Sequence, residues 1–191
     1  GEAFMHQVMN GASPERDGSH DEHMSPHNVY RCAGEDRWIA IGCGSDDEFA
    51  ALCEAIGKAE LASDARYATL ADRKANEDAL DAEIEGWTSE QDPFAATEKL
   101  QAAGVAAYPP LVNQEVMESP QLEARDFWVE KEHLEVGVRR HAGIPWHFSE
   151  TPLAVQRAAP VMGQDNEYVF GELLGMSSDE IAGLVEREVI K

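Results

Sequence analysis

The one histidine cluster of the chain lies in a polar stretch near its start. His20, His23 and His27 are spaced three and four residues apart, with Asp21 and Glu22 between them. Zinc accepts imidazole nitrogens and carboxylate oxygens as ligands, so these residue types could hold a metal ion. The HExxH pattern is absent, however, and a loop fixes its ligands less firmly than a helix does. We therefore expect no metal site and keep a metal-dependent protein as a minor alternative.

The three cysteines indicate neither a disulfide framework nor a metal site. Cys32, Cys43 and Cys53 are odd in number and lack the C-x-x-C spacing. We expect them to be reduced thiols in a protein core. A glycine-rich phosphate loop, a GxSxG turn and a Ser/His/Asp pattern are also absent. We therefore assign no catalytic residue to this chain.

The composition is that of an acidic globular protein. The chain has 191 residues, 43% of them hydrophobic, and a formal net charge of −22 at pH 7. Nucleic acids and anionic membrane surfaces require clustered lysine and arginine, so neither is expected as a partner. No run of 18 apolar residues and no signal-peptide pattern is present, so we expect a cytoplasmic protein.

The strongest local pattern is a hairpin followed by a helix. Two β-favouring runs, residues 29–32 and 37–43, flank a turn-forming tetrapeptide. Ser45 and Glu48 then have the spacing of a capping box, and Gly57 favours a helix end. The residues between them repeat at helical spacing and predict one buried face, made of Phe49, Leu52, Cys53 and Ile56.

The middle of the chain predicts alternating helices and short strands. A helix is expected over residues 73–87, with Leu80, Ile84 and Trp87 buried and a solvated acidic face that includes Asp81. A second helix is expected over residues 93–104, then a strand over 105–108 and two brief helices over 113–119 and 120–125.

The last third changes in character. Three short β-rich runs, residues 127–133, 138–141 and 144–149, predict a three-stranded meander. An extended connector and two capped helices follow, the second with Ser177 and Glu180 as a capping box. The fold class expected is α+β, with antiparallel strands in a hairpin and a meander, flanking helices and a C-terminal helical segment.

We expect three regions along the chain. Residues 1–27 hold the end of a linking helix, stopping at Gly11, and a polar loop; residues 28–150 form a small α+β domain. Residues 151–191 are a connector and helices that pack on a missing large domain. The first residue is Gly, and we expect the chain to be a fragment of a longer protein.

Six blocks of sequence, in this order and spacing, resemble the C-terminal half of family III CoA-transferases. That family includes formyl-CoA and carnitine CoA-transferases and 2-methylacyl-CoA racemases. The blocks are VYRCAGEDRWIAI, FAALCEAIG, LASDARYATLADRKANEDAL, LQAAGVAAYPPL, SPQLEARDFWVEKEHLEVG and APVMGQDNEYVFGELLGMSSDEIAGL. The resemblance implies that this chain is the small domain, that an N-terminal large domain carries the CoA site, and that two subunits interlock as a homodimer.

The resemblance also implies a reaction. CoA moves between carboxylic acids through an aspartate nucleophile and an aspartyl-CoA intermediate, whereas the racemase branch uses an acid/base pair beside the thioester. These residues lie upstream in the family, so this chain alone is predicted to be inactive. CoA is a substrate of the parent protein, and no cofactor is expected on this chain. A non-catalytic acidic interaction module remains the alternative from a different class.

One loop can be carried over from the family. Residues 13–26 occupy the place of a glycine-rich loop that closes on the acyl intermediate in the transferases. This sequence differs there, with Gly18 as the glycine of the loop and charged residues around it. Gly18, His20 and His27 are therefore our candidates for substrate binding at the mouth of the active site, next to acyl-CoA.

Overall fold

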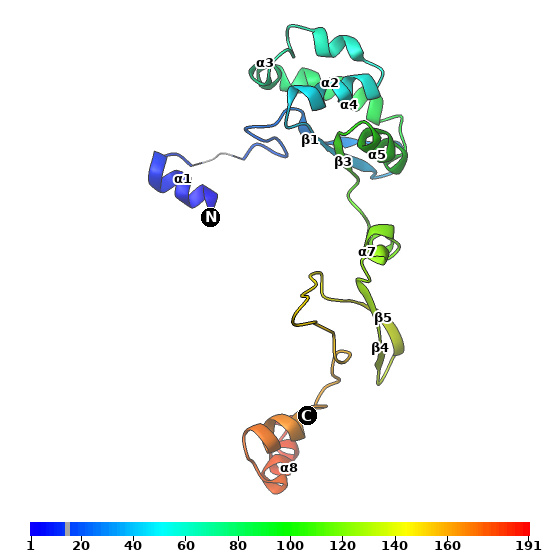
Figure 1. Ribbon diagram of the computed structural model, residues 1–191. Helices are drawn as coiled ribbons and strands as arrows, with labels where there is room; N and C mark the ends of the chain where they lie inside the picture. Colours follow the sequence, from blue (N-terminus) through cyan, green and yellow to red (C-terminus); the bar gives the residue numbers. More distant parts are fainter. Residues whose placement is uncertain (14–15) are drawn as a thin grey trace. The chain divides into compact units, whose positions relative to one another are not determined.

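The computed structural model describes residues 1–13 and 16–191, so residues 14 and 15 of the expected loop lie outside the described part of the chain. The chain divides into two compact units, Gly1–Leu111 and Val112–Lys191. Each unit contains a small antiparallel sheet, and Figure 1 shows the elements along the chain. The mixture of helices and short antiparallel strands confirms the expected α+β class.

A three-stranded antiparallel sheet forms the centre of the first unit. Strands β1 (His27–Arg31) and β2 (Trp38–Gly42) make the predicted hairpin. Strand β3 (Ala106–Tyr108), also predicted, pairs with the other edge of β2. Because successive side chains of a strand point to opposite faces, each strand gives alternate residues to the two faces of this sheet.

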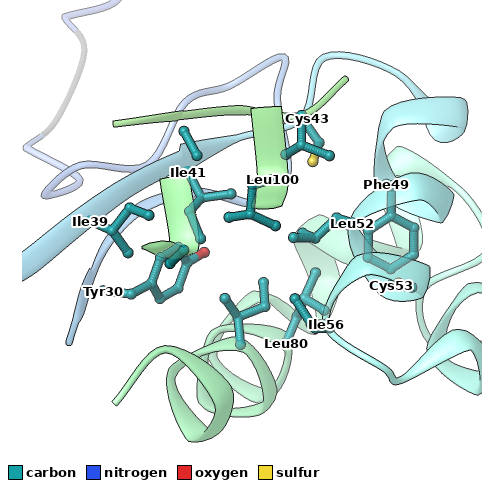
Figure 2. Close-up of a cluster of buried hydrophobic side chains, with 14 of the residues drawn as sticks. Tyr30, Ile39, Ile41, Cys43, Phe49, Leu52, Cys53, Ile56, Leu80 and Leu100 are labelled. Carbon is teal, nitrogen blue, oxygen red and sulfur yellow. The ribbon is translucent and has the colours of Figure 1, made fainter. Parts of the chain in front are cut away.

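One face of the sheet is covered by helices. Tyr30, Ile39 and Ile41 on that face are at most 2% exposed. Helix α4 (Glu77–Thr88) packs against β1, and helix α5 (Pro93–Ala102) packs against β2 and β3. Figure 2 shows the strand side chains meeting those of Leu52, Leu80 and Leu100 in one cluster. Ile84 belongs to the same cluster. The opposite face, with Ala40 and Tyr108, is exposed in this unit.

Helix α2 (Asp46–Ala55) begins where the capping residues predict. Ser45 Oγ accepts a hydrogen bond from the Glu48 N–H at 3.2 Å, and the Glu48 carboxylate accepts one from the Gly44 N–H at 2.6 Å. Gly57 follows the helix with a φ of 76°, a left-handed conformation that glycine adopts without strain. The four predicted apolar positions are buried, which confirms the expected face: Phe49, Leu52, Cys53 and Ile56.

The prediction of one helix over residues 73–87 is wrong. The chain forms α3 (Leu70–Ala75) and α4, which meet at Asn76. Asn76 Nδ2 donates to the Asp72 carbonyl at 2.9 Å, and the Asn76 backbone leaves the helical region with φ −122° and ψ 26°. A side-chain amide that bonds nearby backbone offers an alternative to the helical ladder, so the helix is interrupted there.

The remaining elements of the first unit follow their predicted signals. The Asp92 carboxylate caps α5 by accepting hydrogen bonds from the N–H groups of Phe94 and Ala95, both at 3.0 Å. Helix α1 (Glu2–Asn10) ends at Gly11, whose φ is 67°, as expected. A 3₁₀ turn, η1 (Ala59–Ser63), connects α2 to the residues before α3.

The second unit begins with the two brief helices that were predicted, α6 (Asn113–Met117) and α7 (Pro120–Ala124). They precede a hairpin of β4 (Trp128–His133) and β5 (Gly137–Ala142). A strand over residues 144–149 was also expected, and that prediction is wrong, because these described residues form no strand.

The reason for the missing third strand lies at the open end of the hairpin. The Gly143 N–H donates to the Phe127 carbonyl at 2.7 Å. A Cβ at Gly143 would come 2.4 Å from that oxygen, so this close approach requires glycine. Pro145 then lacks the N–H that a sheet ladder needs. The described residues 144–149 therefore do not join the ladder of β4 and β5.

The C-terminal segment contains the π-helix η2 (Glu167–Leu173) and helix α8 (Ser178–Glu186). Ser177 and Glu180 form the predicted capping box. Five large apolar side chains in this segment are 46–64% exposed: Tyr168, Leu173, Leu174, Val185 and Val189. No helix among the described residues is long and apolar enough to cross a bilayer, the longest being α4 with 12 residues.

Candidate functional site

An open groove lies on the exposed face of the three-stranded sheet. Its volume is about 450 Å³, and its lining comes from the three strands, from α5 and from the loop before β1. The walls are mainly apolar and include Met24, Val29, Ala40, Ala106 and Tyr108. His27 also lines the groove and brings a polar ring to it. A groove of this volume is large enough for part of a small ligand.

The contacts of His27 determine its tautomer. Its Nδ1 lies 2.7 Å from the carbonyl oxygen of Ser19. Because a carbonyl oxygen can only accept, Nδ1 carries the hydrogen of the neutral ring. No hydrogen bond joins Nε2 to the residues that the structure describes, so Nε2 is left as an acceptor at the groove.

Gly42 provides the space in which the ring of His27 lies. The two residues are opposite each other in the register of β1 and β2. A Cβ at Gly42 would meet His27 Cδ2 at 3.1 Å and Met24 Cε at 3.4 Å. An alanine there would force the His27 ring to shift by a few tenths of an ångström. The missing side chain at Gly42 thus allows His27 to lie along the groove.

A polar cluster on the covered face of the sheet connects the same loop to α4. Asp81 Oδ2 lies 2.9 Å from His20 Nε2 and 2.7 Å from Asn28 Nδ2, and Asp81 Oδ1 accepts from the Tyr30 hydroxyl at 2.7 Å. The Asp81 side chain is only 15% exposed. The prediction that Asp81 belongs to a solvated acidic face is therefore wrong, because its carboxylate is enclosed by these three donors.

The ring of His20 is surrounded by carboxylates. Its Nδ1 lies 3.7 Å from both Asp17 Oδ1 and Glu77 Oε2, on the side away from Asp81. The hydrogen bond to Asp81 is the main cause of a raised pKa of His20. Burial of the ring opposes this rise, whereas the charges of Glu77, Asp81 and Asp17 add to it. The site therefore favours the protonated imidazole.

Tyr30 keeps its proton in this cluster. Burial is the first cause of the raised pKa of its phenol, and the hydrogen bond to the Asp81 carboxylate is the second. The hydroxyl therefore stays a donor to Asp81 over the physiological pH range. Asp81 is held by Tyr30 whether or not His20 is protonated.

Arg73 of α3 is a buried cation that holds the end of the loop. Its Nε donates to the Ser25 carbonyl at 2.8 Å and its Nη1 to the Tyr67 carbonyl at 3.2 Å. Its Nη2 donates to Asp46 Oδ1 at 2.6 Å, and the guanidinium lies 4.6 Å from the centre of the Phe49 ring. The loop thus enters β1 from a fixed position.

The three predicted substrate-binding residues occupy different surroundings. Gly18 has a φ of 61°, a left-handed backbone conformation that glycine adopts without strain. A Cβ there would meet nothing within 4 Å, so the backbone conformation, and not lack of space, favours glycine. His20 turns toward Asp81, and His27 lines the groove. Contact of these residues with a substrate stays a prediction.

The loop histidines do not converge on one point. His20 bonds Asp81, His27 bonds the Ser19 carbonyl, and the His23 backbone N–H donates to Asp21 Oδ1 at 2.7 Å. Among the residues described, no group of three or more His, Cys, Asp or Glu side chains is placed to hold a metal ion.

The three cysteines are buried and form no disulfide with one another. Burial raises the pKa of Cys43 to about 12 and that of Cys53 to about 11, and it also raises the pKa of Cys32. They are thiols of the core, as the sequence predicted. Because a thiol that stays protonated is a poor nucleophile, we assign them no catalytic role.

Sequence reasoning missed the structural roles of Asp81 and Arg73. One signal was available for Asp81, which follows Leu80 directly and precedes Ile84 by three residues. These spacings place it at the border of the apolar stripe of its helix, where a side chain can reach the protein interior. For Arg73 no local pattern distinguishes it from an exposed arginine.

The family model of CoA-transferase family III matches this chain over residues 1–166. The match covers both the loop that holds His20 and His27 and the sheet behind it. This chain belongs to CoA-transferase family III. The family resemblance expected from the six sequence blocks is confirmed.

Curated relatives in this family are longer than this chain. It is 39% identical over 167 residues to a protein of Mycobacterium tuberculosis named Probable CoA-transferase Rv1866, covering 87% of this chain and 21% of that protein. It is 30% identical over 182 residues to the succinyl-CoA–D-citramalate CoA-transferase of Chloroflexus aurantiacus, covering 95% and 45%. The chain thus spans less than half the length of these relatives.

The fold is also similar to a solved structure. A crystal structure of a CAIB/BAIF family protein from Brucella suis matches with a TM-score of 0.75 and 27% identity. The match covers 90% of this chain and 44% of that one. Again, this chain corresponds to less than half of its relative.

Proposed function

We propose that this chain is the small-domain part of an enzyme that transfers CoA between carboxylic acids. The observation that carries this proposal is the family match over residues 1–166, together with curated relatives that are named as CoA-transferases. We favour transfer over 2-methylacyl-CoA racemisation because these relatives carry the name of the transfer reaction.

The proposed reaction proceeds through a carboxylate nucleophile that lies outside these 191 residues. The aspartate attacks the thioester carbonyl of acyl-CoA, giving a mixed anhydride and a CoA thiolate. The thiolate then attacks the aspartyl carbonyl of the anhydride, which forms aspartyl-CoA and releases the donor acid. An acceptor carboxylate repeats the two steps in reverse and leaves as a new acyl-CoA, so the aspartate is regenerated.

The groove beside His27 is where this chain would border the acyl group. Its apolar walls suit a carbon chain, and His27 Nε2 can accept one hydrogen bond at its edge. We assign Gly18, His20 and His27 to the mouth of that active site, with His27 at the groove itself. The net charge of −22 supports placing the CoA phosphates on another domain, and we assign no cofactor to this chain.

The partners we propose are a large N-terminal domain and a second copy of the complete protein. The exposed apolar side chains of η2 and α8 support a packing partner for that segment. The length of the relatives supports a large domain, since this chain covers 21–45% of the two curated proteins compared above. A cytoplasmic location fits CoA chemistry and is likewise a proposal.

The test is a transfer assay on two proteins. The complete protein is expected to move CoA from succinyl-CoA to one or more acids of a panel of dicarboxylic and hydroxy acids, detected as new acyl-CoA by mass spectrometry. The 191-residue chain is expected to show no transfer under the same conditions. Turnover by the 191-residue chain would place the nucleophile within it, and failure of the complete protein with every acceptor would refute the proposed reaction class.

A further inference from the structure

We propose that His20 and Asp81 are positioning residues that form a latch. The latch holds the loop of residues 16–26 against helix α4, and through the Ser19 carbonyl it keeps His27 in its Nδ1–H tautomer at the groove. Protonation of His20 tightens the latch. The latch is a structural property of this chain. Only its effect on CoA transfer rests on the proposed function.

The first step is the connection between the latch and His27. Ser19 and His20 are neighbours in the chain, and each makes one of the two contacts: the Ser19 carbonyl accepts from His27 Nδ1 at 2.7 Å, and His20 Nε2 lies 2.9 Å from Asp81. A shift of His20 away from Asp81 therefore moves the acceptor of His27. Without that acceptor, the neutral ring of His27 is free to place its hydrogen on either nitrogen.

The second step is the rigidity of Asp81. It lies on α4, which packs against β1, and two donors from β1 bond its carboxylate, Asn28 at 2.7 Å and Tyr30 at 2.7 Å. Asn28 is the residue next to His27 in that strand. The Asp81 carboxylate thus bonds both strand β1, which carries His27, and the loop, which carries Ser19 and His20. It therefore fixes the loop relative to the strand.

The third step concerns the hydrogens of protonated His20. In protonated His20 both ring nitrogens carry a hydrogen, and Nε2 donates to Asp81 Oδ2 at 2.9 Å, with Asn28 Nδ2 3.0 Å from the same nitrogen. The hydrogen on Nδ1 faces the carboxylates of Asp17 and Glu77 at 3.7 Å. Charged His20 is therefore attracted by all three acids, and the neutral ring loses that attraction.

The charges that face His20 come from the loop, α3 and α4. Lys74 of α3 opposes protonation and is partly neutralised by Glu77, whose carboxylate lies 2.7 Å from Lys74 Nζ. Lys74 also donates to the Asp21 carbonyl at 3.0 Å, so it attaches the loop to α3 at a second point. The groups to be considered together are Asp17 and Asp21 of the loop, Lys74 of α3, Glu77 and Asp81 of α4, and Tyr30 of β1.

The direction of the pH dependence follows from the raised pKa of His20. A group whose pKa is raised by folding contributes its full stabilisation below the pKa of the unfolded chain, about 6.5 for histidine. That contribution is lost as the pH rises through the folded value. The latch is therefore tightest in mild acid and loosens above neutrality, while Lys74 and Arg73 keep the loop attached.

The test uses nitrogen-15 NMR of the imidazole rings in the 191-residue chain, which reports which ring nitrogen carries the hydrogen. Wild-type His27 is expected to show, at pH 6.5, an excess of the Nδ1–H tautomer about 2- to 12-fold above that of a free histidine ring, as one net hydrogen bond provides. In His20→Ala the excess is expected to fall toward the mixture of a free histidine ring. In His20→Gln, whose amide can donate to Asp81, it is expected to persist.

Two further variants keep the test decisive. Asp78→Asn changes an exposed acid on the same helix and is expected to leave both histidines unchanged. Gly42→Ala is expected to displace His27 without altering the pKa of His20, since it touches the ring and not the latch. An unchanged His27 tautomer in a folded His20→Ala or Asp81→Ala chain would overturn the positioning role. A titration midpoint of the His20 ring that is unchanged in a folded Asp81→Ala chain would overturn the coupling between the protonation of His20 and the latch. No CoA is present, so the result is independent of the transfer assay.

Discussion

Replacement of Arg73 by methionine is expected to destabilise the first unit by about 2–6 kcal/mol. The two carbonyls that Arg73 bonds belong to Ser25 and Tyr67, which are both fully buried. A buried polar group left without its partner costs about 1–3 kcal/mol, so two give the range above. The ion pair with Asp46 adds less than about 1 kcal/mol, because the Asp46 side chain is 67% exposed and solvent screens it.

The methionine side chain preserves the apolar contact with Phe49 and removes the three donors. The measurement is urea unfolding followed by far-ultraviolet circular dichroism at pH 7, with the free energy extrapolated to water. Arg66→Met is the matched control, because the Arg66 side chain is 54% exposed and pairs with Asp64 at the surface. The control is expected to change the free energy of unfolding by less than about 1 kcal/mol.

A loss in Arg73→Met no larger than that in Arg66→Met would refute the role of Arg73 as the anchor of the loop. If Arg73→Met does not fold, Arg73→Lys provides the answer. A lysine keeps the charge but cannot span two carbonyls with a planar fork, so an intermediate loss is expected. Wild-type stability of Arg73→Lys would show that the charge alone matters and would contradict the geometric reasoning.

Two more predictions concern the core of the first unit. Leu80→Ala is expected to lower the free energy of unfolding in urea by about 2–5 kcal/mol, because Leu80 is 0% exposed. The control Leu134→Ala, at a 75% exposed position, should change it by no more than about 0.5 kcal/mol. Equal effects of the two substitutions would mean that the sheet is not packed against α4. Cys32, Cys43 and Cys53 are expected to resist a thiol reagent at pH 8 and to react fully in urea, since burial raises the pKa of all three; fast labelling of the folded chain would contradict their burial.

The elements with local chemical signals were the ones that sequence could predict. The capping residues Ser45, Asp92 and Ser177 each mark a helix that is present, because the bond they make involves only the next three residues. The hairpin of β1 and β2 could also be predicted from neighbouring residues, because a turn-forming tetrapeptide separates its two strands. The buried face of α2 could be predicted for the same reason, from periodicity alone.

The parts that sequence could not predict depend on contacts between distant residues. His20 and Asp81 are 61 residues apart, and Arg73 and Ser25 are 48 apart. Asp81 was read as solvated because its neighbours on α4 are acidic, and its three donors come from the loop and β1. The third strand over residues 144–149 failed for a related reason, since its β-rich composition says nothing about the Gly143–Phe127 bond that closes the hairpin.

The most direct measurement is the position of the covalent intermediate in the complete protein. The protein is mixed with succinyl-CoA, the acylated carboxylate is trapped as a hydroxamate with hydroxylamine, and the modified peptide is located by mass spectrometry. The proposed function predicts modification of one aspartate outside the stretch printed here as Gly1–Lys191. A hydroxamate on any aspartate or glutamate within this stretch would contradict it.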